Sequence, residues 1–316
     1  MTDEAFVEVL YETVLGRPSD RGGREAILAD LARGADPKKI LKRFVDSAEY
    51  AARMRSAGNC TGASTAFARR HRAPVLDLLA HLAPHDVVGC GKIRVGRDND
   101  GGYVMLDDFA GLAVAYSLGI ADDASWDKQI AGVGLDVFQY DHTIVRPPEA
   151  DTRFHWRQCR VEAVPSGDPS SVTLVEALRE NGHAAGSDCL LKIDVEGAEW
   201  EIFAAIAPDL LRVFRQIVCE LHGLGGAVDP TRCALMRKAL INLTAYHRVV
   251  HVHGNNHAPW ALIGGVAVPD VLEITLARID DRTFVPAAGT FPSPLDQPNH
   301  PEHADFQLGC FRFGES

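Results

Sequence analysis

Carboxylate and imidazole side chains stand at the ends of three successive apolar segments in the second half of the chain. They are Asp194, Glu220, His222, His251 and His253. The i, i+2 spacing within the pairs 220/222 and 251/253 puts both members of a pair on one face of a strand. Because the carboxyl ends of neighbouring parallel strands lie at one edge of a sheet, we expect all five side chains to converge on one site.

Two kinds of catalysis suit such a site. A mixed set of oxygen and imidazole ligands can hold Mg²⁺, Mn²⁺ or another divalent ion, and sugar or diol hydroxyls bound to that ion would lose a proton near neutral pH. Alternatively, His222 or His251 acts as a general base without a metal, since the ordinary pKa of histidine lies near working pH. Asp194 is the third predicted catalytic residue. A purely structural role for His251 is also open.

A glycine turn and an isolated aspartate form a second motif. Gly119 follows the apolar run 112–118, where the backbone would turn closely around a ligand, and Asp141 ends the next apolar run. A carboxylate at that second strand end can accept both ribose hydroxyls of an adenosine, which fits NAD and S-adenosylmethionine alike. The sequence lacks a G-x-G-x-x-G motif here, and Asp122 and Asp123 would repel a pyrophosphate. Charge therefore favours the cationic S-adenosylmethionine.

The elements that must position these residues alternate between strand and helix. Apolar, strand-like runs cover residues 112–118, 135–140, 154–159, 189–193, 216–221, 247–253 and 271–278. Helix-like segments cover residues 125–133, 171–181 and 200–207, with Glu199 and Glu201 expected on a solvated helix face. This order predicts an α/β fold. The last two strands are joined by a loop without a helical pattern and are expected to pair antiparallel.

The first fifty residues have a different pattern. Apolar residues recur at helical spacing in 5–15, 24–31 and 37–50, with glycine stops and a capping aspartate between them. This predicts a small all-helical module over residues 1–55. Small polar residues and then a basic helix-like stretch over 66–82 follow, so we expect residues 56–90 to be a linker with a connecting helix. The second domain is expected to cover residues 91–316.

Composition excludes several classes of protein. The chain has 316 residues, a formal net charge of −11 and 46% hydrophobic residues, which is typical of globular domains. A negative chain disfavours nucleic-acid binding, which needs clustered Lys and Arg. Apolar runs are too short to span a bilayer and no secretory signal is visible, so we expect a cytoplasmic protein. Seven scattered cysteines without a CxxC pair disfavour a disulfide framework or a zinc ribbon.

Several segments of the second domain carry a resemblance to a known family. They are residues 94–105 (RVGRDNDGGYVM), 117–127 (SLGIADDASWD), 191–199 (LKIDVEGAE), 250–256 (VHVHGNN) and 264–273 (GGVAVPDVLE). In this order they resemble the FkbM-like methyltransferases. The resemblance implies the class I methyltransferase fold, a Rossmann-like seven-stranded sheet with a reversed last strand, and methyl transfer from S-adenosylmethionine, usually to oxygen. Ala121 departs from the family pattern, in which glycine is more frequent.

The same resemblance implies a set of cofactor-binding positions. These are Asp100, Gly101, Tyr103, Ser117, Gly119, Asp122, Asp141 and Asp194. Ser117, Gly119 and Asp122 would face the methionine part of the cofactor, and Asp141 would face its ribose. The segment 100–103 would close the site from the region that precedes the first core strand.

The N-terminal module carries a resemblance of its own. Residues 6–18 (FVEVLYETVLGRP), 22–23 (GG) and 44–50 (FVDSAEY) resemble the bacterial DUF4214 domain. That family often accompanies glycan-processing domains. The resemblance implies this context only, and the three short helices themselves indicate a docking or oligomerisation module.

Together these features predict an enzyme that methylates a hydroxyl of a sugar or glycoconjugate, with or without a divalent metal such as Mg²⁺ or Mn²⁺. One alternative is the methylation of a small secondary metabolite. Another is a cofactor-binding interaction protein in which catalysis is vestigial.

Overall fold

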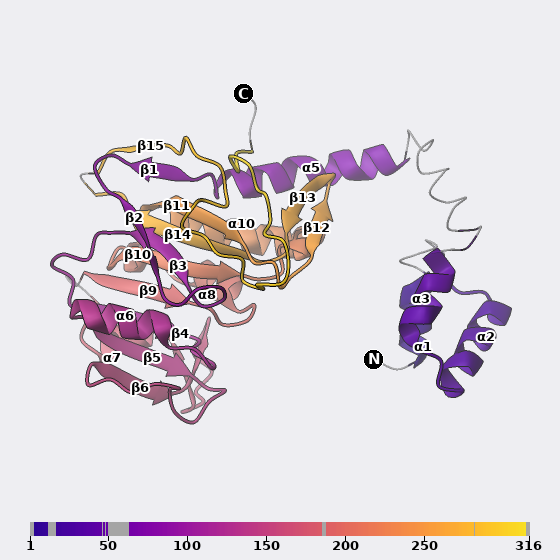
Figure 1. Ribbon diagram of the computed structural model, residues 1–316, viewed down its shortest axis with the longest axis horizontal. Coiled ribbons are helices and arrows are strands. Elements are labelled where there is room, and N and C mark those ends of the chain that lie inside the picture. Colours follow the sequence, from indigo (N-terminus) through magenta and orange to yellow (C-terminus); the bar gives the residue numbers. More distant parts are fainter. Residues whose placement is uncertain are drawn as a thin grey trace. The chain divides into compact units, whose positions relative to one another are not determined.

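The chain divides into two compact units, Met1–Ala68 and Arg69–Ser316. The computed structural model describes residues 3–11, 17–45, 47, 49, 63–184, 188–280 and 282–313. Figure 1 shows the elements of both units. Each unit is described by itself.

The first unit contains the helices α1 (Asp3–Leu10), α2 (Arg21–Ala32) and α3 (Pro37–Val45). The side chain of Asp20 caps α2 by accepting the Gly23 N–H at 2.8 Å. Buried apolar residues from all three helices form its core, with Tyr11 and Phe44 edge to face at 4.9 Å between ring centroids. The expected extensions to residues 15 and 50 fall partly on 12–16 and 50, which lie outside the described residues.

The structure describes part of the segment that connects the two predicted domains. The predicted linker residues 56–62 lie outside the described part, and the predicted connecting helix is present as α5 (Ala63–Ala80). The next element, β1 (His85–Val87), pairs antiparallel with β15 (Phe284–Pro286) near the other end of the chain. Residues 85–87 are therefore part of the second unit, although the sequence placed them in the connecting stretch.

The second unit is built on a seven-stranded sheet in the order β11-β14-β10-β9-β4-β5-β6. Its strands are β4 (Val114–Leu118), β5 (Asp136–Asp141), β6 (Phe154–Gln158), β9 (Cys189–Ile193), β10 (Phe214–Leu221), β11 (His247–Gly254) and β14 (Leu272–Arg278). Strand β14 runs antiparallel to both its neighbours, β10 and β11, and the other pairings are parallel. The expected seven-stranded sheet with a reversed last strand is thus confirmed.

The strand order creates a crevice at one position of the sheet. From β4 the chain builds outward to β5 and β6, and it then returns to place β9 and β10 on the other side of β4. At such a reversal the crossover connections leave toward opposite faces, and ligands bind outside the carboxyl ends of the two central strands. Here these ends are Leu118 of β4 and Ile193 of β9.

Both faces of the sheet are covered. One face packs against α7 (Leu174–Glu180), α8 (Glu199–Ala205) and α10 (Pro230–Thr244), with Phe203 and Met236 fully buried. The other face packs against α6 (Ser125–Val133) and a hairpin of β2 (Lys92–Val95) and β3 (Tyr103–Leu106), as Figure 1 also shows. Short apolar strands are typical of a parallel sheet that is buried on both sides.

The predicted helix over residues 171–181 is wrong at its start. Residues Ser171–Thr173 form β8, which pairs in parallel with β7 (Arg160–Glu162), and α7 begins only at Leu174. The start is set by a capping box, because the Thr173 hydroxyl accepts the Glu176 N–H and the Glu176 carboxylate accepts the Thr173 N–H.

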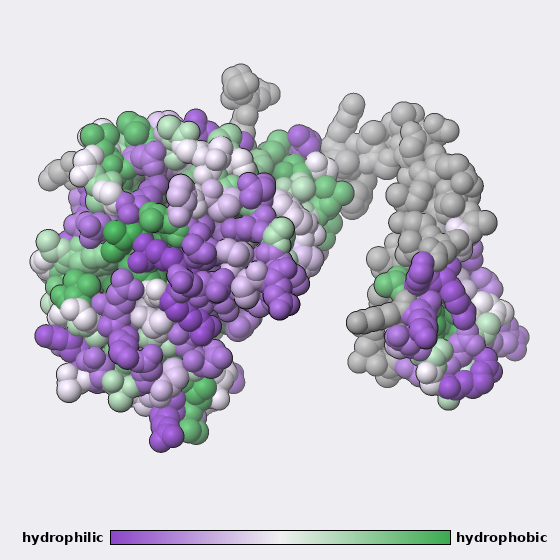
Figure 2. Space-filling view, viewed as in Figure 1, coloured by the Kyte–Doolittle hydropathy of each residue, from purple (hydrophilic) through white to green (hydrophobic). Residues whose placement is uncertain are grey.

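Smaller elements complete the second unit. They are α9 (Pro208–Leu211), the 3-10 helix η2 (Leu224–Val228), β12 (Trp260–Ile263) and β13 (Val266–Pro269). Strands β12 and β13 form a hairpin in the connection that the sequence predicted as a loop. Hydrophilic residues cover most of the visible face of this unit, with smaller apolar areas between them (Figure 2). None of the helices in the described part combines the length and apolar character that a membrane crossing requires.

Candidate active site

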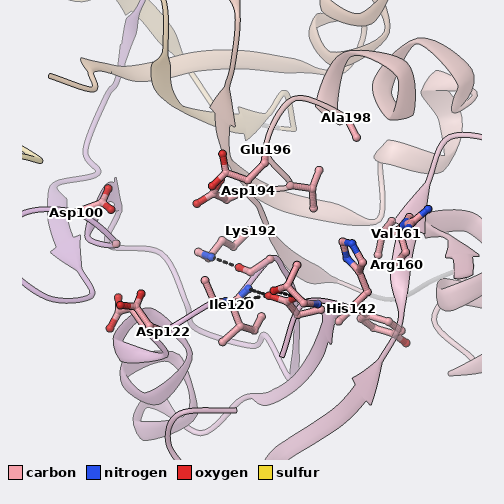
Figure 3. A pocket seen from close by; sticks show the side chains of 18 of the residues that line it. Asp100, Ile120, Asp122, His142, Arg160, Val161, Lys192, Asp194, Glu196 and Ala198 are labelled. Carbon is pink, nitrogen blue, oxygen red and sulfur yellow. Dashed lines mark hydrogen bonds between the residues drawn. The ribbon is translucent and has the colours of Figure 1, made fainter. Parts of the chain in front are cut away.

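A cavity of about 530 Å³ lies at the carboxyl ends of β4, β5 and β9. Figure 3 shows it with Asp100 and Asp122 on one side and His142 and Arg160 on the opposite side. Asp194 and Glu196 line it from the loop that follows β9. The cavity therefore occupies the crevice that the strand order predicts.

The turn after β4 forms one wall of this cavity. Gly119 has φ +80°, and its carbonyl oxygen accepts a 2.7 Å hydrogen bond from Nζ of Lys192 on β9. Ala121, where the related family more often has glycine, also has positive φ, at +48°. A non-glycine residue pays a conformational cost in this region. Other contacts must hold the turn in place.

Asp141, at the end of β5, supplies those contacts. Its Oδ2 accepts the N–H groups of Ile120 and Ala121 at 2.8 and 2.9 Å. Its Oδ1 accepts the N–H and the hydroxyl of Thr143, both at 2.6 Å. Burial alone would raise the pKa of Asp141, but these donors outweigh it and lower the pKa. Asp141 lines the cavity as expected, yet Oδ2 is engaged by the turn after β4 and Oδ1 by Thr143.

Most other predicted cofactor residues line the cavity, and one does not. Asp100, Gly101 and Tyr103 reach it from the β2–β3 connection, and Asp122 is exposed at its edge. Ser117, in contrast, is fully buried within β4 and does not line the cavity. The expectation for Ser117 was wrong, because it lies within the strand and both faces of the sheet are covered there.

Asp194, Glu220 and His222 converge beside the cavity. One ligand atom of each residue lies within 4.8 Å of the others. Nε2 of His222 lies 4.0 Å from Oδ1 of Asp194 and 3.8 Å from Oε1 of Glu220. We call these three residues the acid–imidazole cluster. The sequence brought them together correctly, since all three follow or end the neighbouring strands β9 and β10.

His251 and His253 do not join this cluster, so the expected convergence of all five residues was wrong. Nε2 of His251 contacts Oδ1 of Asp296 at 2.8 Å, and its ring packs edge to face against Phe291. His253 lies between Glu273, at 2.9 Å from Nδ1, and Asp305, at 3.1 Å from Nε2. Both rings are buried. Carboxylates thus contact both ring nitrogens of His253 and Nε2 of His251, and the buried His251 fits the structural role.

The acids around His253 set its charge. Burial alone would lower the pKa of His253, but the hydrogen bonds to Asp305 and Glu273 outweigh it and raise the pKa to about 10. His253 is therefore a cation at neutral pH. It serves as a buried counterion to Glu273.

Sequence reasoning missed Glu199, which is fully buried at the start of α8. Its carboxylate accepts the N–H groups of Val195 and Gly197 at 2.8 and 2.9 Å, and Oε1 lies 3.2 Å from Nδ1 of His222. The expectation of a solvated face was wrong for Glu199 because the loop after β9 folds back over it. Glu201 fits that expectation better, since it is partly exposed and pairs with Arg232.

A second group of acids adjoins the first. Asp100, Glu220 and Glu273 also present oxygens within 4.8 Å of one another. Nδ2 of Asn299 donates to Glu273 at 2.5 Å and to Asp100 at 3.1 Å. Neither Glu273 nor Asn299 was predicted. The sequence signal for Asn299 is absent, because the segment after residue 286 has no periodic pattern.

This concentration of acids changes their protonation. Burial raises the pKa of Glu220 well above its ordinary value, and the neighbouring Asp194, Glu273 and Asp100 raise it further. Burial also raises the pKa of Asp194, with Lys192 and His222 opposing the shift. Burial and mutual repulsion thus favour the protonated form of both carboxyl groups.

Comparison with known proteins identifies only the N-terminal part of the chain. Residues 1–54 match the model of a family described as a domain of unknown function, DUF4214. This match confirms the predicted N-terminal module. No curated protein matches the chain.

Proposed function

We propose that the second unit is an S-adenosylmethionine-dependent methyltransferase that acts on a hydroxyl group, with a sugar or glycoconjugate as the acceptor class. The observation that carries the proposal is the cavity at the carboxyl ends of β4 and β9, bounded by the Gly119 turn and rimmed by Asp122 and Asp194. The sugar acceptor rests on the context that the DUF4214 resemblance implies, and residues 1–54 match that family.

The residues of the cavity fit this cofactor. Its volume of about 530 Å³ lies within the range of roughly 300–1,000 Å³ that small-molecule sites occupy. Asp100, Asp122, Asp123 and Asp194 line it, which suits a ligand carrying a sulfonium and an ammonium group. The exposed Asp122 disfavours NAD, whose pyrophosphate it would meet at the turn, whereas Asp123 is paired with Arg97 at 3.5 Å.

The chain's own residues divide the work of binding. S-adenosylmethionine, when bound, supplies an electrophilic methyl group on sulfur. Asp141 and Lys192 hold the Gly119 turn from two sides, which keeps that wall of the cavity rigid. Asp122 and Asp194 provide negative charge where the cationic end would lie. The ribose and adenine would lie toward Asp141, His142 and Arg160.

The acid–imidazole cluster promotes loss of the proton of the acceptor hydroxyl. Nε2 of His222 lies near Asp194 and Glu196, both of which line the cavity. Glu199 contacts the other ring nitrogen and orients the imidazole. His222 acts there either as a general base or as a ligand of a divalent ion that acidifies the hydroxyl. Strong chelation would abolish activity only in the second case.

The test is transfer of a tritiated methyl group from S-adenosylmethionine to a panel of sugars, glycosides and small hydroxylated metabolites. We expect label in a hydroxyl-bearing acceptor, and we expect His222→Ala to lose at least about 100-fold in turnover with nearly unchanged cofactor affinity. Cofactor binding without transfer to any acceptor would instead favour the interaction protein with vestigial catalysis.

A further inference from the structure

We propose that Asp194, Glu220 and His222 bind one divalent cation, and that the acceptor presents two neighbouring hydroxyls to this ion. The cation site stands on the geometry of the acid–imidazole cluster alone. The diol rests on the proposed methyl transfer. The ligand set differs from the one expected from the sequence, because His251 and His253 are engaged elsewhere.

The spacing within the cluster is that of ligands around an ion. Nε2 of His222 lies 4.0 Å from Asp194, 3.8 Å from Glu220 and 3.5 Å from Glu196. These contacts are too long for hydrogen bonds. Ligand atoms about 2.1 Å from a shared cation lie about 3.0 Å apart at right angles and about 4.2 Å apart when opposite. The two distances from His222 to Asp194 and Glu220 fall in this interval, and the oxygens of Asp194 and Glu220 lie within 4.8 Å of each other.

The surroundings of His222 match those of a ligating histidine. Oε1 of Glu199 lies 3.2 Å from Nδ1, and Glu199 is itself fixed by the N–H groups of Val195 and Gly197. A carboxylate on one ring nitrogen selects the tautomer that leaves the other nitrogen free for a metal. The 3.2 Å contact with Glu199 does not satisfy hydrogen-bond geometry, so Nδ1 lacks a hydrogen-bond partner among the described residues, and Nε2 is the nitrogen nearest the acids of the cluster.

Unpaired buried polar groups provide an independent indication. In the described part of the chain, Oδ1 of Asp194 is buried and has no hydrogen-bond partner. Asn299 is only 2% exposed, and its amide reaches Asp100 and Glu273, which form the second acid group around Glu220. Its Oδ1 also lacks a partner among the described residues. Native proteins rarely leave such groups unsatisfied.

Charge balance favours the same conclusion. Three acids, Asp100, Asp194 and Glu273, lie around the carboxyl group of Glu220, which is buried. Of the nearby cations, His253 is already shared between Glu273 and Asp305, and Lys192 and His222 partly offset the charge of Asp194. Uncompensated buried carboxylates are costly, and a divalent ion neutralises two of them. Oxygen ligands with one imidazole suit Mn²⁺ and Mg²⁺.

The free coordination positions of the cation site indicate an acceptor with two neighbouring hydroxyls. Three protein ligands leave coordination positions free, and Asp194 lies at the cavity wall. Two neighbouring hydroxyls can fill two such positions, and the ion lowers the pKa of the one to be methylated. The O–H bond of that hydroxyl breaks, its proton passes to the exposed Glu196 carboxylate and on to water, and the oxygen keeps the electron pair. With that pair the oxygen would bond the methyl carbon while the carbon–sulfur bond of the donor breaks and the thioether leaves.

The test measures Mn²⁺ binding to the full chain after metal removal, through the loss of the electron paramagnetic resonance signal of free Mn²⁺. We expect one bound Mn²⁺ per chain, and at least about a 100-fold loss of affinity in Glu220→Gln and in Asp194→Asn. Glu199→Gln should lose about 10- to 100-fold. Glu201→Gln, a matched change on the exposed part of the same helix, should bind like the unaltered chain.

The cation site would be overturned by either of two results. In the first, the unaltered chain does not bind Mn²⁺ at millimolar concentration. In the second, the variants of the acid–imidazole cluster bind Mn²⁺ as tightly as the unaltered chain. Asp194→Asn decides the question if a variant of a more buried residue fails to fold. Calorimetry with S-adenosylmethionine separates the two proposals, since binding of Mn²⁺ without the cofactor contradicts only the proposed function. If methyl transfer occurs, a vicinal diol should react at least about tenfold faster than the matching mono-alcohol. Equal rates would overturn the diol.

Discussion

A methyl group on Gly119 would stand 1.6 Å from the carbonyl oxygen of Asp194. The turn after β4 and the loop after β9 therefore touch through their backbones at the head of the crevice. Gly119 also has φ +80°, a conformation that other residues adopt at a cost. The close approach of these two loops, which are joined by the hydrogen bond from the Asp194 N–H to the Leu118 carbonyl oxygen, requires a residue without a side chain at position 119.

Gly119→Ala should therefore lower stability by about 3 kcal/mol, since strain and a backbone clash add. Gly134→Ala is the matched control, because Gly134 has φ +109° with no atom near an added Cβ, and it should cost only about 1–2 kcal/mol. Urea unfolding followed by tryptophan fluorescence measures both. Equal losses of stability in the two variants would show that the close contact between Gly119 and Asp194 adds nothing to the cost of the substitution.

Asp141→Asn tests the second support of the turn. An amide cannot accept four donors as the carboxylate does, so buried N–H groups of Ile120, Ala121 or Thr143 would lose partners. We expect a loss of about 1–3 kcal/mol together with at least about a tenfold weaker cofactor affinity. Asp136→Asn, at the exposed start of the same strand, should change neither. Unchanged cofactor affinity in Asp141→Asn would show that Asp141 does not contribute to cofactor binding.

The buried His247 makes stability depend on pH. Burial lowers the pKa of His247 to about 4, and Nε2 lies 2.8 Å from the Phe214 carbonyl oxygen. Between its ordinary pKa and pH 4 the unfolded chain binds a proton that the folded chain does not, so stability falls as pH falls. His247 contributes about 3 kcal/mol to this loss between pH 6.5 and 4.

His247→Gln should flatten the acid side of the stability profile of the second unit, and the exposed His257→Gln should leave it unchanged. All four tryptophans lie after residue 120, so their fluorescence follows this unit alone. A profile as steep in His247→Gln as in the unaltered chain would assign the acid sensitivity to other groups.

The second unit should fold and bind its cofactor without the N-terminal module. The described cavity residues all belong to Arg69–Ser316, and residues 1–54 match a separate domain family. A chain that starts at Ala63 should keep its tryptophan-monitored unfolding midpoint and bind S-adenosylmethionine within about twofold of the full chain. Insoluble material, or loss of cofactor binding, would make the module part of the catalytic core.

The sheet could be predicted from the sequence because its strands carry strong local signals. Strand β9 (Cys189–Ile193) was predicted with its observed bounds, since burial on both faces demands an unbroken apolar run. The convergence of Asp194 with Glu220 and His222 followed from their positions at neighbouring strand ends. The hairpin β12–β13 and strand β8 were missed because short, partly exposed strands lack such runs.

The remaining errors concern contacts between segments far apart in the chain. His251 and His253 were expected at a metal, but Asp296 and Asp305 reach them from 45 and 52 residues away, in a stretch without secondary-structure periodicity. Glu199 looked like a solvated helix residue, and only the folded loop after β9 shows that it is buried. Local patterns cannot predict such partners, because the tertiary fold alone brings them together.

The most direct test of the proposed function is isothermal titration of the full chain with S-adenosylmethionine and, in parallel, with NAD. The acidic lining of the cavity at Asp122 and Asp194 predicts binding of one S-adenosylmethionine per chain at micromolar affinity and no heat from NAD. The reverse result, saturable binding of NAD without binding of S-adenosylmethionine, would contradict the assignment of this cavity to a methyl donor.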